Sequence, residues 1–540
     1  MYKISKVGLF AAFVVVAYLS LPVMAQVESG STGYYNYAPI FSGQTVYGTA
    51  RMQGLAGAGV SLGGDIGQIA YNPASLGFFR KSEVSLSMGV GSTGNKSDFL
   101  GNSTNANRTW FGIPNFGAVF NFSKDDLVPG IFRGGSLGIS FTKVNDYQQR
   151  FLMTGVNNKN SFTDYLVENA NAGLANGRTF NEVFKESPTA PNSLDALAFN
   201  SHLIDYDSFN GKYTASIGVY GNTANNAPYY NRAPYYDFSI GDKAQQRETV
   251  LQKAGQYSWD ISYGANINDR VYLGMGGSIL ISNYLQERVF EEKHLPYGYQ
   301  MKDFTFRETD SHKGTGYVMK AGIIVKATDW LRLGGSIHSP TYNYMRESYS
   351  WGIVGNFENV LIDSFYNTTV SHSDIKTTTN SFNYRFVKPM RASAGITLLA
   401  GKKGFITGDV EFVPYKTASL QYPGNRFLFA SDNATIQNIY TNVFNYKLGA
   451  EWKVTKEYTL RGGYAYYADP YNHVDDLKRD QSYFTFGGGY RIEGFYVDLA
   501  VVQGFTNQRY KPYTLNNGQE PTATIKKHYG FYQVTAGFTF

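Results

Sequence analysis

Apolar and polar residues alternate with a period of two through most of the chain, a pattern typical of strands with one face in an apolar environment. In the segment 256–267, one side carries Tyr257, Trp259, Ile261, Tyr263, Ala265 and Ile267, and the other side carries small or polar residues. A turn at Asn268-Asp269-Arg270 precedes a second alternating segment that starts at Val271. The pattern predicts a long antiparallel hairpin with one apolar face.

The same alternation recurs along the chain and predicts further hairpins. Clear examples flank turns at residues 328–329, 401–404, 455–457 and 492–494, and weaker ones cover residues 84–90, 111–122 and 136–144. The chain also ends on an alternating segment, in which Tyr532, Val534, Ala536, Phe538 and Phe540 share one side. These segments amount to about 14 strands, and single-chain bacterial outer-membrane barrels have an even number.

The connections between the predicted strands alternate between short and long. The long ones fall at about 92–109, 150–255, 286–305, 346–380, 420–440, 468–481 and 506–525. Outer-membrane barrels alternate short periplasmic turns with long external loops, whereas a soluble sandwich or propeller needs no such asymmetry. We therefore predict an all-β fold, a transmembrane antiparallel β-barrel of about 14 strands, in a bacterial outer membrane with both mature termini in the periplasm.

The composition agrees with a barrel, although the mean hydropathy of −0.30 by itself would suggest a soluble protein. Aromatic residues make up 16% of the 540 residues, with 44 Tyr and 38 Phe. Strands that point apolar residues to lipid and polar ones to the lumen average to a hydrophilic value, and Tyr and Trp form interfacial girdles. The absence of Cys excludes disulfides and thiolate metal sites. The net charge of +6 is spread along the chain, so no nucleic-acid partner is expected.

The first 25 residues are typical of a signal peptide. Lys3 and Lys6 precede an apolar stretch, and Val23-Met24-Ala25 provides a small residue before the cleavage site. A single membrane anchor is the alternative, but the apolar stretch is shorter than the roughly 20 residues that span a bilayer. We therefore predict a signal peptide over residues 1–25.

Residues 26–80 differ in character from the rest and are predicted to form a plug in the lumen of a barrel that covers residues 81–540. Gly and Ala dominate the stretch 48–60, and small residues allow close packing against a wall. A barrel of about 14 strands is wider than the side-chain-filled eight-stranded kind, so its lumen needs an obstruction to be selective. Physical reasoning alone therefore places this segment inside the barrel.

The connection at about 150–255 is too long to be a structureless loop in a compact domain. Residues 162–185 have helix-compatible spacing, and residues 213–220 are compatible with a short external strand. We interpret the region as an ordered extracellular insertion with its own helices. An additional hairpin within the barrel is the alternative.

The Gly/Ala-rich stretch with Asp65, followed by Asn72-Pro73-Ala74, resembles the hatch of the FadL family of outer-membrane transporters. The order of leader, plug, about 14 strands and terminal Phe540 is similar to that family along the whole chain. The resemblance implies passive uptake of long-chain fatty acids or other hydrophobic molecules, with lateral exit beside a kink in the third strand. It identifies Asn72, Pro73 and Ala74 as hatch residues, although Ser75 stands where the family usually has Gly. A plain Asn-Pro turn that ends a helix is the alternative for this triplet.

Two further groups of residues are candidates for contact with a ligand. The aromatic side chains of the insertion that we expect either to contact ligand or to pack its own core are Tyr229, Tyr230, Tyr235, Tyr236 and Phe238. The charges that alternation points into the lumen are Asp260, Lys320, Arg332, Arg391, Asp409, Glu411, Lys447, Glu451, Arg461 and Asp498. An internal lattice of ion pairs is the favoured interpretation, and a single Arg or Lys that binds a carboxylate is the other.

No residues indicate an enzyme, and no catalytic residue, metal site or cofactor is predicted. The 7 His residues are scattered, and none form a pair at metal-ligand spacing. The expected partners are a hydrophobic small molecule, the bilayer with its lipopolysaccharide, and the barrel assembly machinery, which recognises a terminal strand ending in Phe. We expect a monomer, because a closed barrel leaves no free edge. A docking or shuttle component of a protein secretion system and a general diffusion porin are the alternative functions.

Overall fold

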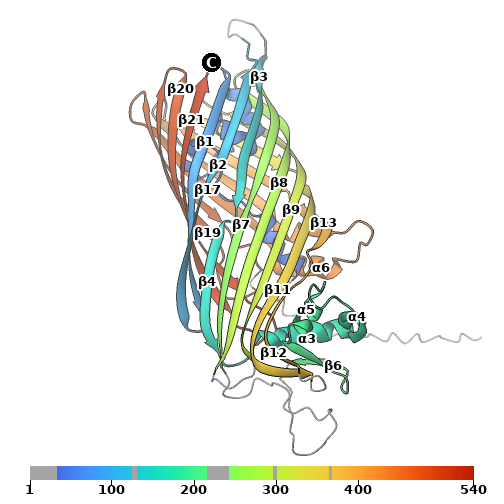
Figure 1. The fold of residues 1–540 in the computed structure, drawn as a ribbon. Coiled ribbons are helices and arrows are strands. Elements are labelled where there is room, and N and C mark those ends of the chain that lie inside the picture. Colours follow the sequence, from blue (N-terminus) through green and yellow to red (C-terminus); the bar gives the residue numbers. More distant parts are fainter. Residues whose placement is uncertain (1–32, 125–129, 216–242, 296–300, 364–367, 473) are drawn as a thin grey trace, which may run out of the picture.

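A closed antiparallel β-barrel makes up most of the structure (Figure 1). The computed structural model describes residues 33–124, 130–215, 243–295, 301–363, 368–472 and 474–540, so the predicted signal peptide lies outside the described residues. Within them, the sheet closes because β1 (Glu83–Phe99) pairs with β2 (Asn102–Asn121) on one side and β21 (Ala523–Thr539) on the other. No helix in this part of the chain is long and apolar enough to cross a bilayer.

Four of the spans consist of consecutive strands separated by a bend, which reduces the 19 strands of the sheet to a 14-strand barrel. These composite spans are β3 (Phe132–Asp146) with β4 (Gln149–Asn157), β10 (Leu331–His338) with β11 (Thr341–Asp363), β12 (Thr368–Lys376) with β13 (Asn380–Lys388) and β14 (Arg391–Leu399), and β15 (Gly404–Pro414) with β16 (Ser419–Gln421). The continuous spans besides β1, β2 and β21 are β7 (Lys243–Ile267), β8 (Val271–Leu295), β9 (Met301–Lys326), β17 (Asn442–Lys453), β18 (Tyr458–Tyr467), β19 (Gln481–Ile492) and β20 (Phe495–Tyr510). The predicted fold class is confirmed.

The outer surface of the barrel exposes large apolar side chains in a band. In β8, Leu273, Met275, Ile279 and Ile281 are all exposed, while the intervening Ser278 and Ser282 are buried. An exposed band of this kind has no stable environment in water but a favourable one in lipid, so it locates the membrane. The band lies toward the end of the barrel that holds Phe540, which we call the terminus end.

Several predicted long connections are wrong, because the strands continue far beyond the apolar band. The stretch 286–305 is mostly β8 and β9, and the stretch 346–380 is mostly β11 and β12. The stretch 92–109 contains only a tight turn, in which Leu100 and Gly101 have φ of 47° and 81°. The reason is that the outward residues of these extensions are mostly polar, so the apolar outer face that marks the membrane strands is missing, although large residues such as Phe290 and Phe304 are buried inside.

The insertion predicted at 150–255 is shorter than expected, because β4 extends to Asn157 and β7 begins at Lys243. It contains the helices α3 (Phe162–Ala175), α4 (Phe180–Phe184) and α5 (Leu194–Asn200) and a separate sheet of β5 (Ile204–Asp207) and β6 (Lys212–Ala215). The helices predicted over 162–185 are present, and β6 begins at the expected external strand. Within the described residues, β5 and β6 pair only with each other, so the alternative of an extra barrel hairpin is wrong there.

The helices of the insertion cover the other end of the barrel, which we call the loop end (Figure 1). Each begins with a side-chain cap: Ser161 and Thr179 form capping boxes with Asp164 and Glu182, and Ser193 accepts from the N–H of Ala196. Their apolar faces pack on Phe290, Phe304, Phe306 and Ile353, which point inward from the strand extensions. The helix α6 (Ala430–Ile439) contacts the 3-10 turn η4 (Tyr415–Thr417) and β16.

Residues 33–80, which we call the N-terminal segment, contain five short helical elements. These are η1 (Tyr34–Asn36), α1 (Tyr37–Ser42), α2 (Ala50–Gly54), η2 (Ile66–Ala70) and η3 (Pro73–Phe78). The segment forms hydrogen bonds with strands on opposite sides of the barrel, with the side chains of Thr535 in β21 and Asp409 in β15 and with the backbone of β9. It therefore fills the barrel interior between the terminus end and the middle.

Candidate ligand pathway

Glycines of the barrel wall lie directly against the backbone of the N-terminal segment. A Cβ atom added to Gly274 of β8 would lie 2.2 Å from the backbone nitrogen of Ala74, and one added to Gly334 of β10 would lie 2.4 Å from the carbonyl oxygen of Val60. A Cβ atom added to Gly449 of β17 would lie 2.8 Å from the carbonyl oxygen of Leu55. The small residues that the sequence analysis noted in the segment thus have counterparts on the wall, and both are needed for this packing.

Asn72 connects the N-terminal segment to the wall and also shapes it locally. Its Nδ2 donates to the carbonyl oxygens of Val60 at 2.7 Å and Gly335 at 3.3 Å, and its Oδ1 accepts from the N–H of Ala74 at 3.0 Å. Pro73 occupies the first position of η3, where its missing N–H costs nothing. Asn72, Pro73 and Ala74 are all fully or almost fully buried. The triplet is therefore both a helix start and a point of attachment to β10.

Charged groups of the wall bind the backbone of the N-terminal segment and the side chain of Arg51. Asp409 accepts from the N–H groups of Gly59 at 2.7 Å and Val60 at 3.0 Å, and Arg51 donates from Nε to Glu451 at 2.9 Å. Burial raises the pKa of Asp65, although Arg51 and Thr49 work against this effect. Charge-assisted hydrogen bonds of this kind are about twice as strong as neutral ones.

The predicted lattice of lumen ion pairs exists for most of the charges proposed. Arg391 pairs with Glu411 at 2.9 Å, Arg461 pairs with Glu451 at 2.7 Å and with Asp498, and Lys320 pairs with Asp260. Lys447 and Arg332 instead lie over aromatic rings, those of Tyr71 and Phe78 respectively. The interior of the terminus half is thus largely neutralised by its own contacts.

The third span bends inward between β3 and β4, and its pairing with β2 stops there. The β2–β3 ladder runs from Asn121–Ser136 to Asn115–Thr142, and within the described residues the rest of β2 pairs only with β1. Beyond the bend, β4 pairs with β7, and the Arg150 carbonyl oxygen accepts from Nδ2 of the lumen-facing Asn95 at 2.7 Å. The backbone ladder therefore has a discontinuity between β2 and the third span, which Thr104 of β2 spans only by a side-chain hydrogen bond to the carbonyl oxygen of Leu152.

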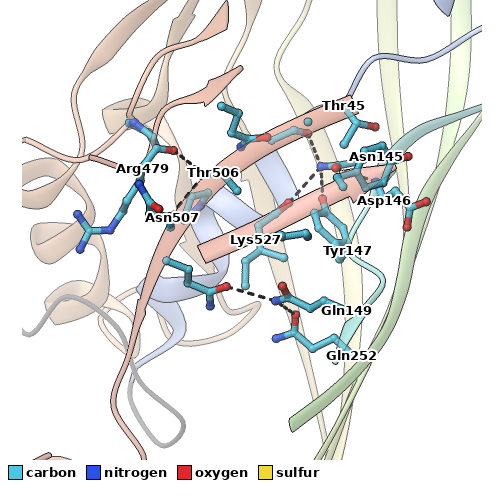
Figure 2. A pocket seen from close by; sticks show the side chains of 18 of the residues that line it. Thr45, Asn145, Asp146, Tyr147, Gln149, Gln252, Arg479, Thr506, Asn507 and Lys527 are labelled. Atoms are coloured by element: carbon cyan, nitrogen blue, oxygen red, sulfur yellow. Dashed lines mark hydrogen bonds between the residues drawn. The ribbon is translucent and has the colours of Figure 1, made fainter. Parts of the chain in front are cut away.

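A cavity of about 260 Å³ lies inside the barrel at this bend (Figure 2). Asn145, at the bend, donates to the carbonyl oxygen of Gly43 in the N-terminal segment. Gln149 of β4 donates to Gln252 of β7 at 2.6 Å and to Gln508 of β20 at 3.3 Å. The cavity wall thus mixes amides with aromatic rings and touches the N-terminal segment, the third span and the last two strands.

Lys527 is the cation of the cavity lining that has no ion pair within the described residues. It points inward from β21 and lines the cavity together with Arg479 and Arg509 (Figure 2). Both arginines bind Asp475, at 2.6 Å and 2.7 Å. Burial opposes the charge of Asp475, but the hydrogen bonds from Arg479 and the N–H of Leu477 lower its pKa overall. Lys527 is thus available to an anionic ligand.

Sequence reasoning missed Lys527 because it did not extend the terminal strand inward. Tyr532, Val534 and Phe538 are exposed, so odd-numbered positions of β21 face the lumen, and the inward direction of Lys527 follows from that alternation.

Sequence reasoning also missed a second group: Asp310, His312 and Glu347 lie buried together, with donor atoms within 4.8 Å of one another. Tyr37 donates to Asp310 at 2.5 Å and Tyr34 donates to Glu347, which ties the start of the N-terminal segment to the wall.

The five aromatic residues predicted as ligand contacts, Tyr229, Tyr230, Tyr235, Tyr236 and Phe238, lie outside the described residues. Their role stays a prediction. The structure brings Asn72 and Ala74 against the wall but not into the cavity lining. The cavity itself is built by residues that the sequence analysis did not single out.

The fold and the site define a transmembrane β-barrel of the outer-membrane type, with an N-terminal segment packed in its lumen. No family model and no curated protein matches the chain. Among solved structures, it is similar to a Pseudomonas aeruginosa FadL homologue, with a TM-score of 0.54 and 13% identity over 92% of this chain and 99% of that one. The toluene transporter TodX of P. putida matches with a TM-score of 0.49 and 12% identity over 92% and 99%. The FadL-type architecture that the sequence indicated is therefore confirmed as a fold.

Proposed function

We propose that the protein is a passive channel for hydrophobic molecules with an acidic end, long-chain fatty acids in particular. The loop end faces the outside and both mature termini face the periplasm, as the short turns of outer-membrane barrels do. Ligand enters at the loop end, reaches the cavity, and leaves sideways through the discontinuity between β2 and the third span. The N-terminal segment keeps the lumen closed to water and ions.

The observation that carries this proposal is the position of the cavity at the bend between β3 and β4. The cavity is lined by Asn145 and Gln149 of the third span, just past Thr142, where the ladder between β2 and this span ends. The straight route through the terminus half is closed by the N-terminal segment and its contacts with Asp409 and Glu451. The free energy of an apolar molecule falls when it moves from a polar lumen into lipid, so the sideways route is thermodynamically favourable.

The size and chemistry of the cavity support an acidic headgroup with an apolar tail. A volume of about 260 Å³ is below the range of roughly 300–1,000 Å³ for pockets that enclose a drug-sized ligand. The cavity therefore holds the polar end of a long molecule, with Lys527 opposite the carboxylate and the tail directed toward the discontinuity. The FadL homologue has a similar fold, and the toluene transporter TodX is named for a hydrophobic substrate.

The deciding experiment is uptake of a labelled long-chain fatty acid by cells that lack their own transporter and express this chain. Surface assembly of the intact chain and of a chain without residues 48–77 is confirmed first. Uptake by the intact chain supports the proposal, and comparison with the deletion shows whether the N-terminal segment gates it. A correctly assembled barrel without fatty-acid uptake contradicts the proposal.

The Lys527→Gln variant is expected to lower uptake of a fatty acid by about tenfold, since a hydrogen bond to a charged group contributes roughly 1.5–3 kcal/mol. Uptake of a neutral hydrocarbon of similar length should stay within twofold of the unaltered chain. Lys526→Gln is the matched control, because the neighbouring Lys526 points outward and its side chain is 61% exposed. Equal losses for both ligands, or for both lysines, would show that Lys527 does not bind the carboxylate.

A second candidate is a docking or shuttle role in protein secretion, which the ion-pair-filled terminus half favours. The insertion would then bind a partner chain, and its exposed Phe184 and Phe209 offer apolar contacts. In that case the assembled barrel takes up no fatty acid, and deletion of residues 158–215 abolishes secretion without affecting barrel assembly. The uptake experiment therefore separates the two functions.

A further inference from the structure

Three cations gather on the outer face of the barrel, just beyond the apolar band toward the loop end. Lys313 of β9 and Arg346 of β11 lie directly opposite each other across the two strands. Arg385 of β13 lies opposite Tyr344, one diagonal step from Arg346. We call these three residues the basic triad. They line a concavity of about 690 Å³ on the wall between β8 and β13.

The basic triad is not neutralised by the protein. Like charges directly opposite each other destabilise a strand pair, so their presence calls for a compensating anion. Within the described residues, none of the three forms an ion pair, and the Nε of Arg385 is buried without a hydrogen-bond partner. The neighbouring outward residues are neutral: Asn283, Thr315, Ser348, Ser381, Asn383 and Gln421.

Three other cations of the strand extensions form ion pairs with carboxylates. Arg247 pairs with Glu291 at 2.9 Å, Lys253 with Glu287 at 3.1 Å, and Lys302 with Glu358 at 3.4 Å. Each of these cations has a carboxylate on the neighbouring strand. The absence of carboxylates around the basic triad is thus a local feature of β9, β11 and β13, and it leaves an anion-binding surface.

The height of the basic triad on the wall indicates the kind of anion. Tyr317, Tyr342 and Tyr344 are exposed next to it on the membrane side, and exposed tyrosines mark the level of lipid headgroups. Beyond Tyr317 on β9 follow the exposed apolar Met319 and Ile323, which belong to the apolar band. Arg385 also lies over the ring of Tyr344, which holds its guanidinium at this level.

We propose that the basic triad binds the phosphate of a phosphorylated glycolipid in the outer leaflet. Arginine matches phosphate oxygens with two parallel N–H donors, and lysine adds a point charge. The acyl chains of the same lipid lie along Met319 and Ile323 below. The orientation with the loop end outward is taken from the proposed function, but the binding itself requires no transport.

The test uses the full-length barrel in detergent and measures retention of lipid A by native mass spectrometry during titration. Replacing the basic triad by Lys313→Gln, Arg346→Gln and Arg385→Gln is expected to weaken binding of phosphorylated lipid A by at least about tenfold. Dephosphorylated lipid A should bind the unaltered protein as weakly as phosphorylated lipid A binds the triple variant. Inorganic phosphate alone should not compete, because it lacks the acyl contacts.

The matched control carries Arg247→Gln, Lys253→Gln and Lys302→Gln, which remove the same charge from the same outer surface. Its binding should stay within about threefold of the unaltered protein, since exposed ion pairs contribute little. Equal weakening in both variants, or equal binding of phosphorylated and dephosphorylated lipid, would overturn the proposal. Competition by free phosphate would overturn it too, and would identify a site for a soluble anion. Fatty-acid uptake by the triple variant is measured separately, so failure of this proposal is distinguishable from failure of the channel.

Discussion

Placing a valine at Gly274 is expected to release the N-terminal segment from the wall and to raise the ion conductance of the barrel in planar bilayers. A Cβ at this position would lie 2.2 Å from the nitrogen of Ala74 and 2.3 Å from the carbonyl carbon of Pro73. Backbone atoms at such distances cannot yield locally, so η3 must move away. Asn72 then loses its contact with the carbonyl oxygen of Gly335, and water enters the lumen.

The control for this prediction is Gly277→Val in the same strand. Gly277 faces lipid, and a Cβ there would meet no atom within 4 Å. The two variants make the same chemical change three residues apart, one on each face of the wall. Conductance that stays low in Gly274→Val, with the folded barrel confirmed by its heat-dependent mobility on a gel, would show that the N-terminal segment does not close the channel through this contact.

Replacing Arg288 by methionine is expected to lower the free energy of unfolding of the loop half by about 3–5 kcal/mol. The Arg288 side chain is 0% exposed and donates to Glu248 at 2.7 Å, to Glu308 at 2.6 Å and to the carbonyl oxygen of Pro512 at 2.6 Å. Its removal leaves two buried carboxylates without a cation, which is the costly way to break a buried ion pair. Hydrogen exchange of the β8–β9 extension measures the change.

The comparison variant is Arg247→Met on the same hairpin. Its side chain is 52% exposed and its partner Glu291 is 43% exposed, so the expected cost is about 0–1 kcal/mol. A variant that combines Arg288→Met with Glu248→Gln and Glu308→Gln should recover part of the lost stability, because the carboxylate charges are then absent. Equal protection from exchange in Arg288→Met and Arg247→Met would contradict the prediction.

The membrane-embedded part of the fold was predictable because lipid and lumen impose opposite demands on neighbouring residues. Met275 and Ile279 face lipid while Ser278 is buried on the other side, and this contrast is visible in sequence. Beyond the membrane, toward the loop end, the outer face of the strands contacts water, so polar residues are favoured on that face. Phe290 is buried inward against α3, and Glu287 and Glu291 face water. An alternation that changes sign within one strand was mistaken for a loop, which is why the extensions of β8, β9 and β11 were missed.

The candidate site was less accessible to sequence reasoning because it depends on contacts between distant strands. Gln149, Gln252 and Lys527 line one cavity only because β4, β7 and β21 approach one another inside the barrel. The bend between β3 and β4, and the loss of pairing beyond Thr142, have no distinct sequence pattern. Asn72 was identified through the resemblance of the Asn72-Pro73-Ala74 triplet to a known hatch, whereas local geometry alone indicated only a turn before Pro73.

The length of the hairpin formed by β8 and β9 determines how far the loop end of the barrel lies from the membrane surface. A strand of 25 residues, inclined as barrel strands are, rises roughly 60 Å along the barrel axis, more than twice the roughly 25 Å of an outer-membrane apolar band. Most of the excess length lies at the loop end, so the strands extend beyond the membrane and carry α3, α4 and α5 at their far end. In the proposed orientation, the long strands hold these helices far outside the outer leaflet, so the entrance to the barrel lies well beyond the membrane surface.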